Sequence, residues 1–190
     1  MRKLVVSLLV TALLAVGGWF AASAIVPTVL SATASIPSPT AACLAAAPVT
    51  VGTIVVPAGP VAGFCQPELI MAAHIMNAAR DQGIGTHTQA VGVMTAIGES
   101  GLRNLDYGDA AGPDSRGLFQ QRDNGAWGTL ADRMDPYTAA SNFFAKATSI
   151  DGWQTMAPSD LAHAVQVNAD PGYYSRYWGD AVTIVDALGG

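Results

Sequence analysis

Residues 67–101 read PELIMAAHIMNAARDQGIGTHTQAVGVMTAIGESG and contain two helical patterns in succession. In the first pattern, Pro67 suits the first turn of a helix and Gly83 follows the last turn. Apolar residues recur between them at the spacing of one helix face: Leu69, Ile70, Ala72, Ile75, Met76 and Ala79. The pattern therefore predicts a helix between Pro67 and Gly83.

A second helix is expected to begin at Thr86 or Thr88, because either hydroxyl group can cap its N-terminus. The helix should run to about Glu99, where Gly98 and Gly101 mark its end. Its apolar residues are Val91, Val93, Met94 and Ile97. Because they leave no wide polar face, we expect this helix to pack centrally.

Further helices are expected toward the C-terminus. Each of three N-cap signatures is followed by a helix-compatible segment: Asp135–Pro136, Ser159–Asp160 and Asp170–Pro171. The predicted helices lie near residues 136–147, 159–168 and 171–187. Beyond a short extended piece near 117–121, no segment alternates convincingly as a strand. The expected fold class is therefore all-α, a compact helical domain over residues 65–190.

The start of the chain has a different composition. Within residues 1–65 only Arg2 and Lys3 are charged, and residues 4–30 form an uncharged stretch. This stretch is longer than the ~20 residues that span a bilayer and longer than the h-region of a usual signal peptide. Residues 1–30 are therefore expected to be a cleaved signal peptide or an uncleaved signal anchor, and both alternatives stay open. Either one places the rest of the chain outside the cytoplasm.

Residues 31–64 are rich in Ala, Pro and Val and show no sustained hydrophobic period. Such a composition is typical of an extended spacer, here with room for one short strand at 50–56. The only two cysteines, Cys43 and Cys65, flank much of this segment. In a protein outside the cytoplasm they are expected to form a disulfide, with two free buried thiols as the alternative.

The net charge of the chain and the spacing of its possible metal-ligating residues limit the partners that the sequence predicts. The chain has a formal net charge of −5, so it has no basic surface of the kind that attracts a nucleic-acid backbone. Nucleic-acid binding is therefore not expected. The histidines and cysteines lack zinc-ligand spacing, and Asp106, Asp109 and Asp114 do not follow the pattern of a calcium loop. Neither a metal nor a cofactor is expected.

The stretch without helical pattern, residues 100–129, is rich in polar residues, and such long loops in compact domains are usually functional. Glu99 lies directly before it, at the C-terminal end of an apolar helix. The helix dipole and the apolar neighbours disfavour the ionised carboxylate there, so we expect a raised pKa. A carboxyl group that keeps its proton near neutral pH can act as a general acid. The other glutamate, Glu68, is explained by its place in the first turn of a helix.

Two short motifs stand about twenty residues apart. They are Gly98-Glu99-Ser100, followed by Leu102-Arg103-Asn104, and Gly117-Leu118-Phe119-Gln120. These motifs resemble the Glu-Ser and Gly-Leu-Met-Gln motifs of soluble lytic transglycosylases in the lysozyme-like superfamily, with Phe119 in place of Met. The run GESGLRNLDYGD…SRGLFQQR…GAWGT…GWQ is also similar to exported lysozyme-like domains common in actinobacteria. The resemblance covers residues 67–178 and implies a lysozyme-like fold that is predominantly helical.

The resemblance also implies an activity, which is cleavage of the β-1,4 bond between N-acetylmuramic acid and N-acetylglucosamine in peptidoglycan. Glu99 would protonate the glycosidic oxygen, and the same carboxylate would then act as a base. In a transglycosylase this base activates the muramoyl 6-hydroxyl group and gives a 1,6-anhydro product, a route that needs no second carboxylate. Ser100 would orient Glu99 or the acetamido group of the substrate.

Other residues are expected to bind the sugar. Gln120 would place its amide in the cleft, and Gly117 would let the backbone approach closely. Tyr107 and Trp127 would stack on sugar faces, or else cover the core as ordinary loop side chains. The glycan strands of peptidoglycan are thus the expected partner, together with the membrane if residues 1–30 remain uncleaved.

Some alternatives remain open. The family's third motif, Ala-Tyr-Asn, has no clean counterpart, and the nearest candidates are Val165-Gln166 with Asn168, and Tyr173 or Tyr174. A hydrolase would use Asp106, Asp109 or Asp114 as a water-activating base. The domain would otherwise be a non-catalytic peptidoglycan-binding module, or a scaffold of a conjugation or secretion apparatus. In every case we expect it to be membrane-anchored or secreted, at the cell wall.

Overall fold

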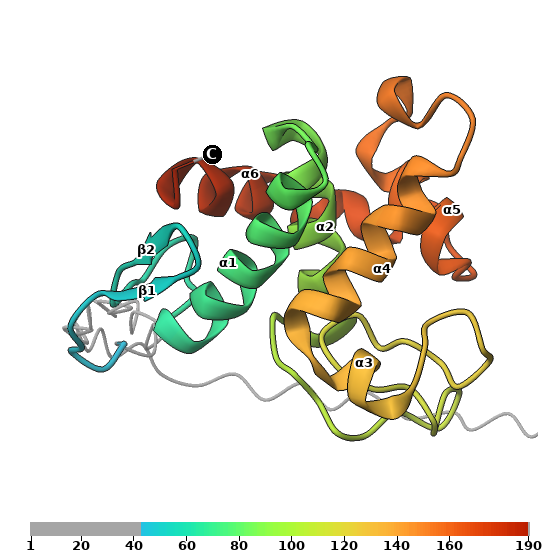
Figure 1. Ribbon diagram of the computed structural model, residues 1–190, viewed down its shortest axis with the longest axis horizontal. Helices are drawn as coiled ribbons and strands as arrows, with labels where there is room; N and C mark the ends of the chain where they lie inside the picture. The colour runs from blue at the N-terminus through green and yellow to red at the C-terminus, as the bar shows by residue number, and fades with distance from the viewer. Residues whose placement is uncertain (1–42, 190) are drawn as a thin grey trace, which may run out of the picture. The chain divides into compact units, whose positions relative to one another are not determined.

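The computed structural model describes residues 43–189, which form a predominantly helical domain with one two-stranded sheet (Figure 1). The elements are β1 (Val49–Val51), β2 (Ile54–Val56), α1 (Gln66–Asp81), α2 (Thr86–Ser100), α3 (Leu130–Met134), α4 (Pro136–Thr148), the 3-10 helix η1 (Trp153–Thr155), α5 (Pro158–Gln166), the 3-10 helix η2 (Tyr173–Tyr177) and α6 (Trp178–Ala187). The predicted signal or anchor segment, residues 1–30, lies outside the described residues. From residue 43 to 189, no helix is both long and apolar enough to cross a membrane.

The first two helices lie where the sequence predicts them, but the N-cap of α2 is Gly85, without a side-chain cap, and not Thr86 or Thr88. Pro67 occupies the first turn of α1, and Gly101 ends α2 in the left-handed conformation with φ +65°. From there the Gly101 N–H donates to the carbonyl of Ile97 at 2.9 Å. α1 packs chiefly against α4, whereas α2 packs against α1, α6 and η2. The central position predicted for α2 is thus confirmed, and the loop of residues 101–129 starts at its C-terminal end (Figure 1).

Residues 49–56 form a β-hairpin instead of the single strand expected within a spacer. β1 and β2 pair antiparallel, with Val49 opposite Val56 and Val51 opposite Ile54. Ile54 and Val56 are buried against α1, and Asn77 of α1 donates from Nδ2 to the carbonyl of Val51 at 2.8 Å. The folded part therefore begins before residue 65. Because the hairpin is anchored by contacts with α1, the short apolar run alone does not indicate it.

The predicted disulfide between Cys43 and Cys65 is confirmed, with Cα atoms 5.4 Å apart. Cys65 directly precedes α1, so the bond fastens the chain at residue 43 to the start of the first helix. Disulfides are typical of proteins outside the reducing cytoplasm, in agreement with the expected compartment.

The C-terminal half differs from the prediction at α3, at η1, which is also not predicted, and after residue 171. α3 has no counterpart in the prediction, and it is a single short turn whose capping box pairs Thr129 with Asp132. The helix predicted for 171–187 is instead η2 followed by α6. In η2, adjacent tyrosines both bond to the end of α2, and these tertiary contacts accompany the tighter 3-10 turn. α4 and α5 lie close to their predicted positions, and Asp135 caps α4 as predicted, but the N-cap of α5 is Ala157 and not Ser159.

Candidate active site

Glu99 lies in the last turn of α2, half-buried, where two cavities adjoin. The larger cavity has a volume of about 580 Å³ and the smaller cavity about 450 Å³. Both are lined by Glu99, Asp109, Ser115, Gln120 and Asn168. The larger and the smaller cavity therefore form one cleft, with Glu99 between its halves.

The pKa of the Glu99 carboxyl group is raised above its ordinary value, mainly because burial disfavours the charged form. Hydrogen bonds from Tyr174 and Gln166 act in the opposite direction, and the negative charge of Asp109 adds to the rise. The predicted direction is thus confirmed. Arg103, which could have lowered this pKa, donates from Nε to the carbonyl of Ser100 at 3.0 Å.

Tyr174 is the direct hydrogen-bond partner of the Glu99 carboxylate. It is fully buried in η2, and its hydroxyl group donates to Oε1 of Glu99. The pKa of Tyr174 is itself raised, first by burial and then by the charge of Glu99, so the phenol remains a neutral donor. The neighbouring Tyr173 donates to the carbonyl of Gly98 at 2.9 Å. Both tyrosines considered for the third motif therefore reach the end of α2.

The end of α5 forms another wall of the cleft. Gln166, its last residue, lines the smaller cavity and donates from Nε2 to the carbonyl of Phe119 at 2.9 Å. The nearby amide of Gln166 also acts to lower the pKa of Glu99. Asn168 lines both cavities, and its Oδ1 lies 2.6 Å from Nδ1 of His163. Gln166 and Asn168 thus contribute to the wall for which the sequence contains no clear motif, whereas Val165 is buried in the core and lines neither cavity.

Ser100 does not face the cleft, where it would orient Glu99 or the substrate. It is buried, lines neither cavity, and its hydroxyl oxygen lies 2.7 Å from the carbonyl of Leu118 and 3.1 Å from that of Ala96. The same oxygen accepts a hydrogen bond from the N–H of Arg103 at 3.2 Å. Its hydrogen bonds therefore go to backbone groups and join the end of α2 to the turn that carries Gln120.

Gly117 allows a close approach between two backbone segments of the protein, and not the approach of backbone to substrate that the resemblance implies. Its φ is +76°, and a Cβ atom on it would lie 1.9 Å from the carbonyl oxygen of Arg133 in α3. It lines neither cavity. Gln120, in contrast, lines both cavities as expected, and its Nε2 donates to the carbonyl of Gly117 at 3.1 Å. The turn is thus built so that Gly117 fits against α3 and Gln120 faces the cleft.

The two aromatic residues expected to bind sugar differ in accessibility. Tyr107 lines the larger cavity and is 59% exposed, so its ring is free to stack. Trp127 belongs to the wall of the smaller cavity but is only 5% exposed. The ammonium group of Lys146 lies 4.6 Å from the centre of the Trp127 ring. Trp127 therefore packs mainly into the core, which is the alternative to sugar stacking for this side chain.

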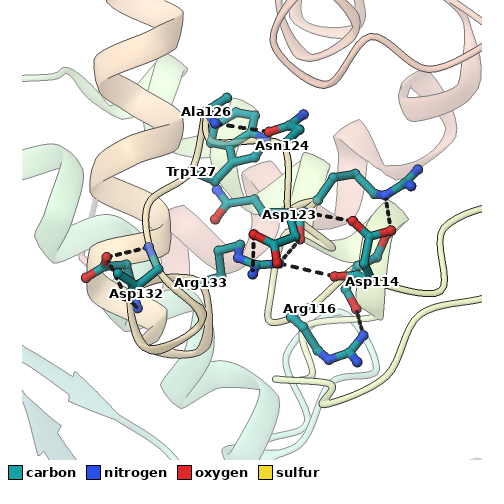
Figure 2. A network of polar contacts seen from close by, with 12 residues as sticks. Asp114, Arg116, Asp123, Asn124, Ala126, Trp127, Asp132 and Arg133 are labelled. Atoms are coloured by element: carbon teal, nitrogen blue, oxygen red, sulfur yellow. Dashed lines mark hydrogen bonds and ion pairs between the residues drawn. The ribbon is translucent and has the colours of Figure 1, made fainter.

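A buried arginine in α3 holds the loop that forms the cleft wall. Arg133 donates from Nη1 to the carbonyls of Asp114 and Gln121 at 3.1 and 3.3 Å, and its Nη2 lies 3.1 Å from the Asp123 carboxylate (Figure 2). Asp114 in turn forms an ion pair with Arg122 at 2.6 Å. The sequence pattern does not mark Arg133, because its role follows only from burial beneath the loop.

Of the three acids considered as a water-activating base, only Asp109 lines the cleft. Its Oδ1 accepts the N–H groups of Ala111 and Gly112 at 2.9 and 2.8 Å, as in an Asx-turn. Asp114 is engaged by Arg122, and Asp106 lines neither cavity. Among residues 43–189, no group of three or more His, Cys, Asp and Glu side chains is placed to hold a metal ion.

The arrangement is suited to proton transfer within a polar cleft. A carboxyl group with a raised pKa can donate a proton, and neutral donors beside it can stabilise the carboxylate that remains. In comparisons with known proteins, no family model matches the chain, and no curated protein matches it. The function must therefore be inferred from the chemistry of the cleft residues and from the motifs that carry them.

Proposed function

We propose that this protein cleaves the β-1,4 bond between N-acetylmuramic acid and N-acetylglucosamine in peptidoglycan, with Glu99 as general acid and then base. The observation that carries the proposal is a half-buried glutamate with a raised pKa in the middle of a cleft. The Glu-Ser and Gly-Leu-Phe-Gln motifs supply the substrate class. The disulfide supports a location outside the cytoplasm, where peptidoglycan lies.

In the first step, Glu99 donates its proton to the glycosidic oxygen. Burial raises the pKa of this carboxyl group and so favours the protonated form that donates. Once the proton has left, Tyr174 donates a hydrogen bond to the new carboxylate, and such bonds are stronger to a charged acceptor; the Gln166 amide also favours the ionised form. These interactions therefore favour the charge distribution that develops during the reaction over that of the starting state.

In the second step, the Glu99 carboxylate takes a proton from the nucleophile. If the nucleophile is the muramoyl 6-hydroxyl group, the product is a 1,6-anhydro sugar and one carboxylate is sufficient. If it is water, Asp109 is the second acid available in the cleft, and the product has a reducing end. Transglycosylation is the version that we propose, because Asp109 accepts backbone hydrogen bonds that hold its loop.

The test is mass spectrometry of the products released from purified peptidoglycan. We expect 1,6-anhydro ends with the unsubstituted protein and none with Glu99→Gln, which should stay folded. Glu68→Gln is the matched control, because Glu68 is the only other glutamate and lines neither half of the cleft. Reducing ends that disappear in Asp109→Asn would indicate a hydrolase instead.

The non-enzymatic alternatives give different results in the same experiment. Sedimentation with peptidoglycan without any released product would indicate a binding module. Capture of envelope proteins that is insensitive to Glu99→Gln, again without product, would indicate a scaffold. Cleavage that persists in Glu99→Gln would contradict the assignment of this residue.

A further inference from the structure

Lys146 is a partly buried cation on the wall of the smaller cavity. It lies in α4, and its Nζ donates one hydrogen bond, to the carbonyl of Val165 at 2.6 Å. The Trp127 ring covers it from another side, with 4.6 Å between Nζ and the ring centre. An ammonium group has three N–H donors, so it can still donate toward the cavity.

No carboxylate of the described part of the chain forms an ion pair with Lys146. The ion pairs within residues 43–189 join Arg122 to Asp114 and Arg133 to Asp123. Burial accordingly lowers the pKa of Lys146, with no acid to raise it again. Because burying a cation without a counter-ion is unfavourable, an anion that entered the cavity would gain a partner there.

The rest of the smaller cavity indicates what else such a ligand carries. Five residues with amide side chains line it: Gln120, Gln121, Asn124, Gln166 and Asn168. Amide side chains both donate and accept hydrogen bonds, which suits the acetamido and peptide groups of a ligand. The acids on this wall are Glu99, whose charged form is disfavoured by burial, and Asp109, which is held by its own loop. Arg122 also lines the cavity and is already paired with Asp114.

We propose that the smaller cavity binds the carboxylate-bearing substituent of a muramoyl residue, with Lys146 as the partner of that carboxylate. The inference rests on the proposed cleavage of peptidoglycan and adds a determinant of substrate choice. The carboxylate has two possible sources. It belongs to the lactyl group itself where the sugar carries no peptide, or to the stem peptide where one is attached. An oligomer of N-acetylglucosamine has the same linkage and neither carboxylate.

Calorimetry tests whether Lys146 binds the carboxylate. The measurement uses the full chain with Glu99→Gln, because this variant should leave the ligands uncleaved. The three ligands are an N-acetylglucosamine tetramer, a peptide-free muramoyl tetramer and a peptide-bearing one. We expect a carboxylate-bearing ligand to bind about 10-fold more tightly than the neutral one, as for a charge-assisted hydrogen bond. Adding Lys146→Gln should remove most of this preference and leave the neutral tetramer within about twofold. Arg80→Gln, which removes a positive charge outside both cavities, is the control.

Each outcome has a distinct meaning. A preference for the peptide-bearing tetramer alone assigns the carboxylate to the stem, and a preference for the peptide-free one alone assigns it to the lactyl group. Equal binding of all three ligands, or equal weakening of all three by Lys146→Gln, overturns the inference and leaves the cleavage proposal intact. Binding of none of them contradicts the cleavage proposal itself. If Lys146→Gln does not fold, salt dependence decides, because a preference unchanged at high salt is not due to an ion pair.

Discussion

At Glu99, burial and hydrogen bonding act in opposite directions on one carboxyl group. Burial stabilises the protonated form, whereas Tyr174 and Gln166 stabilise the carboxylate. A residue that must first give up a proton and later take one needs both forms to be accessible. The competition at this side chain therefore fits the two roles that we propose for it, and it can be measured in the stability of the protein as well as in its activity.

The first prediction concerns the stability of Glu99→Gln. Because the folded protein raises the pKa of Glu99, it binds this proton more tightly than the unfolded chain does. The stabilisation is complete below the unfolded pKa and is lost as the pH rises through the folded pKa. Urea unfolding at several pH values should show Glu99→Gln gaining stability relative to the unsubstituted protein as the pH rises through that window. A relative loss would identify Glu99 as a structural ion-pair partner.

The second prediction concerns Tyr174→Phe. Loss of the hydroxyl group removes a hydrogen bond to the carboxylate, so the pKa of Glu99 should rise further. The alkaline limb of the pH–activity profile should move to higher pH, and kcat should fall about 10-fold or more. Tyr173→Phe is the matched control, because its hydroxyl group bonds to the carbonyl of Gly98 and not to a carboxylate. A limb that moves to lower pH, or moves equally in both variants, would contradict the role of Tyr174.

At the scale of elements, the fit between the 117–120 turn and α3 gives the third prediction. Gly117→Ala places a Cβ atom 1.9 Å from the carbonyl oxygen of Arg133, and backbone must move to relieve the overlap. We expect a loss of at least about 2 kcal/mol in the free energy of unfolding. Gly125→Ala is the control, since Gly125 has a similar φ of +80° but nothing within 4 Å of the added atom. It should lose only about 1 kcal/mol.

The comparison of these two glycines needs one measurement, which is urea unfolding of both variants beside the unsubstituted protein. Equal losses would mean that the left-handed backbone alone explains the glycine at 117 and that its proximity to α3 is unimportant. A second measurement is the activity of Gly117→Ala under folding conditions, which should fall because Gln120 moves with the turn.

The elements that the sequence predicts well are those specified by local patterns. α1, α2 and α4 carry apolar spacing together with a proline, glycine or aspartate at their ends, and these signals lie within or next to the helix. The hairpin, α3 and η2 depend on partners far along the chain. A pattern within a few residues carries no information on such partners, so the predicted strand count and the predicted start of the last helix are wrong, whereas α6 lies within the predicted range.

The same distinction applies to the candidate site. Glu99, Gln120 and Tyr107 line the cleft, and their motifs or loop position mark them in the sequence. Ser100 belongs to the same motif as Glu99, but its hydroxyl group bonds to backbone and not to the cleft. Arg133 is not marked at all, because a charged residue is ordinarily predicted to be exposed.

At the scale of the whole domain, the disulfide gives the last prediction. It closes a loop whose ends are 22 residues apart in sequence. On the chain-entropy account, such a bond stabilises the fold by about 3 kcal/mol. Reduction should therefore lower the midpoint of urea unfolding, with a change of this size. The double variant Cys43→Ser, Cys65→Ser should start at the lower value and should not respond to reductant. An unsubstituted protein that is equally stable before and after reduction would contradict this.

The same bond also decides how the domain would respond to mechanical load. Tension applied through the polypeptide that precedes Cys43 passes across the sulfur atoms to Cys65 and so reaches the first turn of α1 directly. The 44–64 segment, including the hairpin, is bypassed and bears none of the pull. If the domain is tethered through this preceding chain while it holds the ligand that we propose, its N-terminal hairpin would thus stay folded under a force that, in the reduced protein, would separate β1 and β2 from α1.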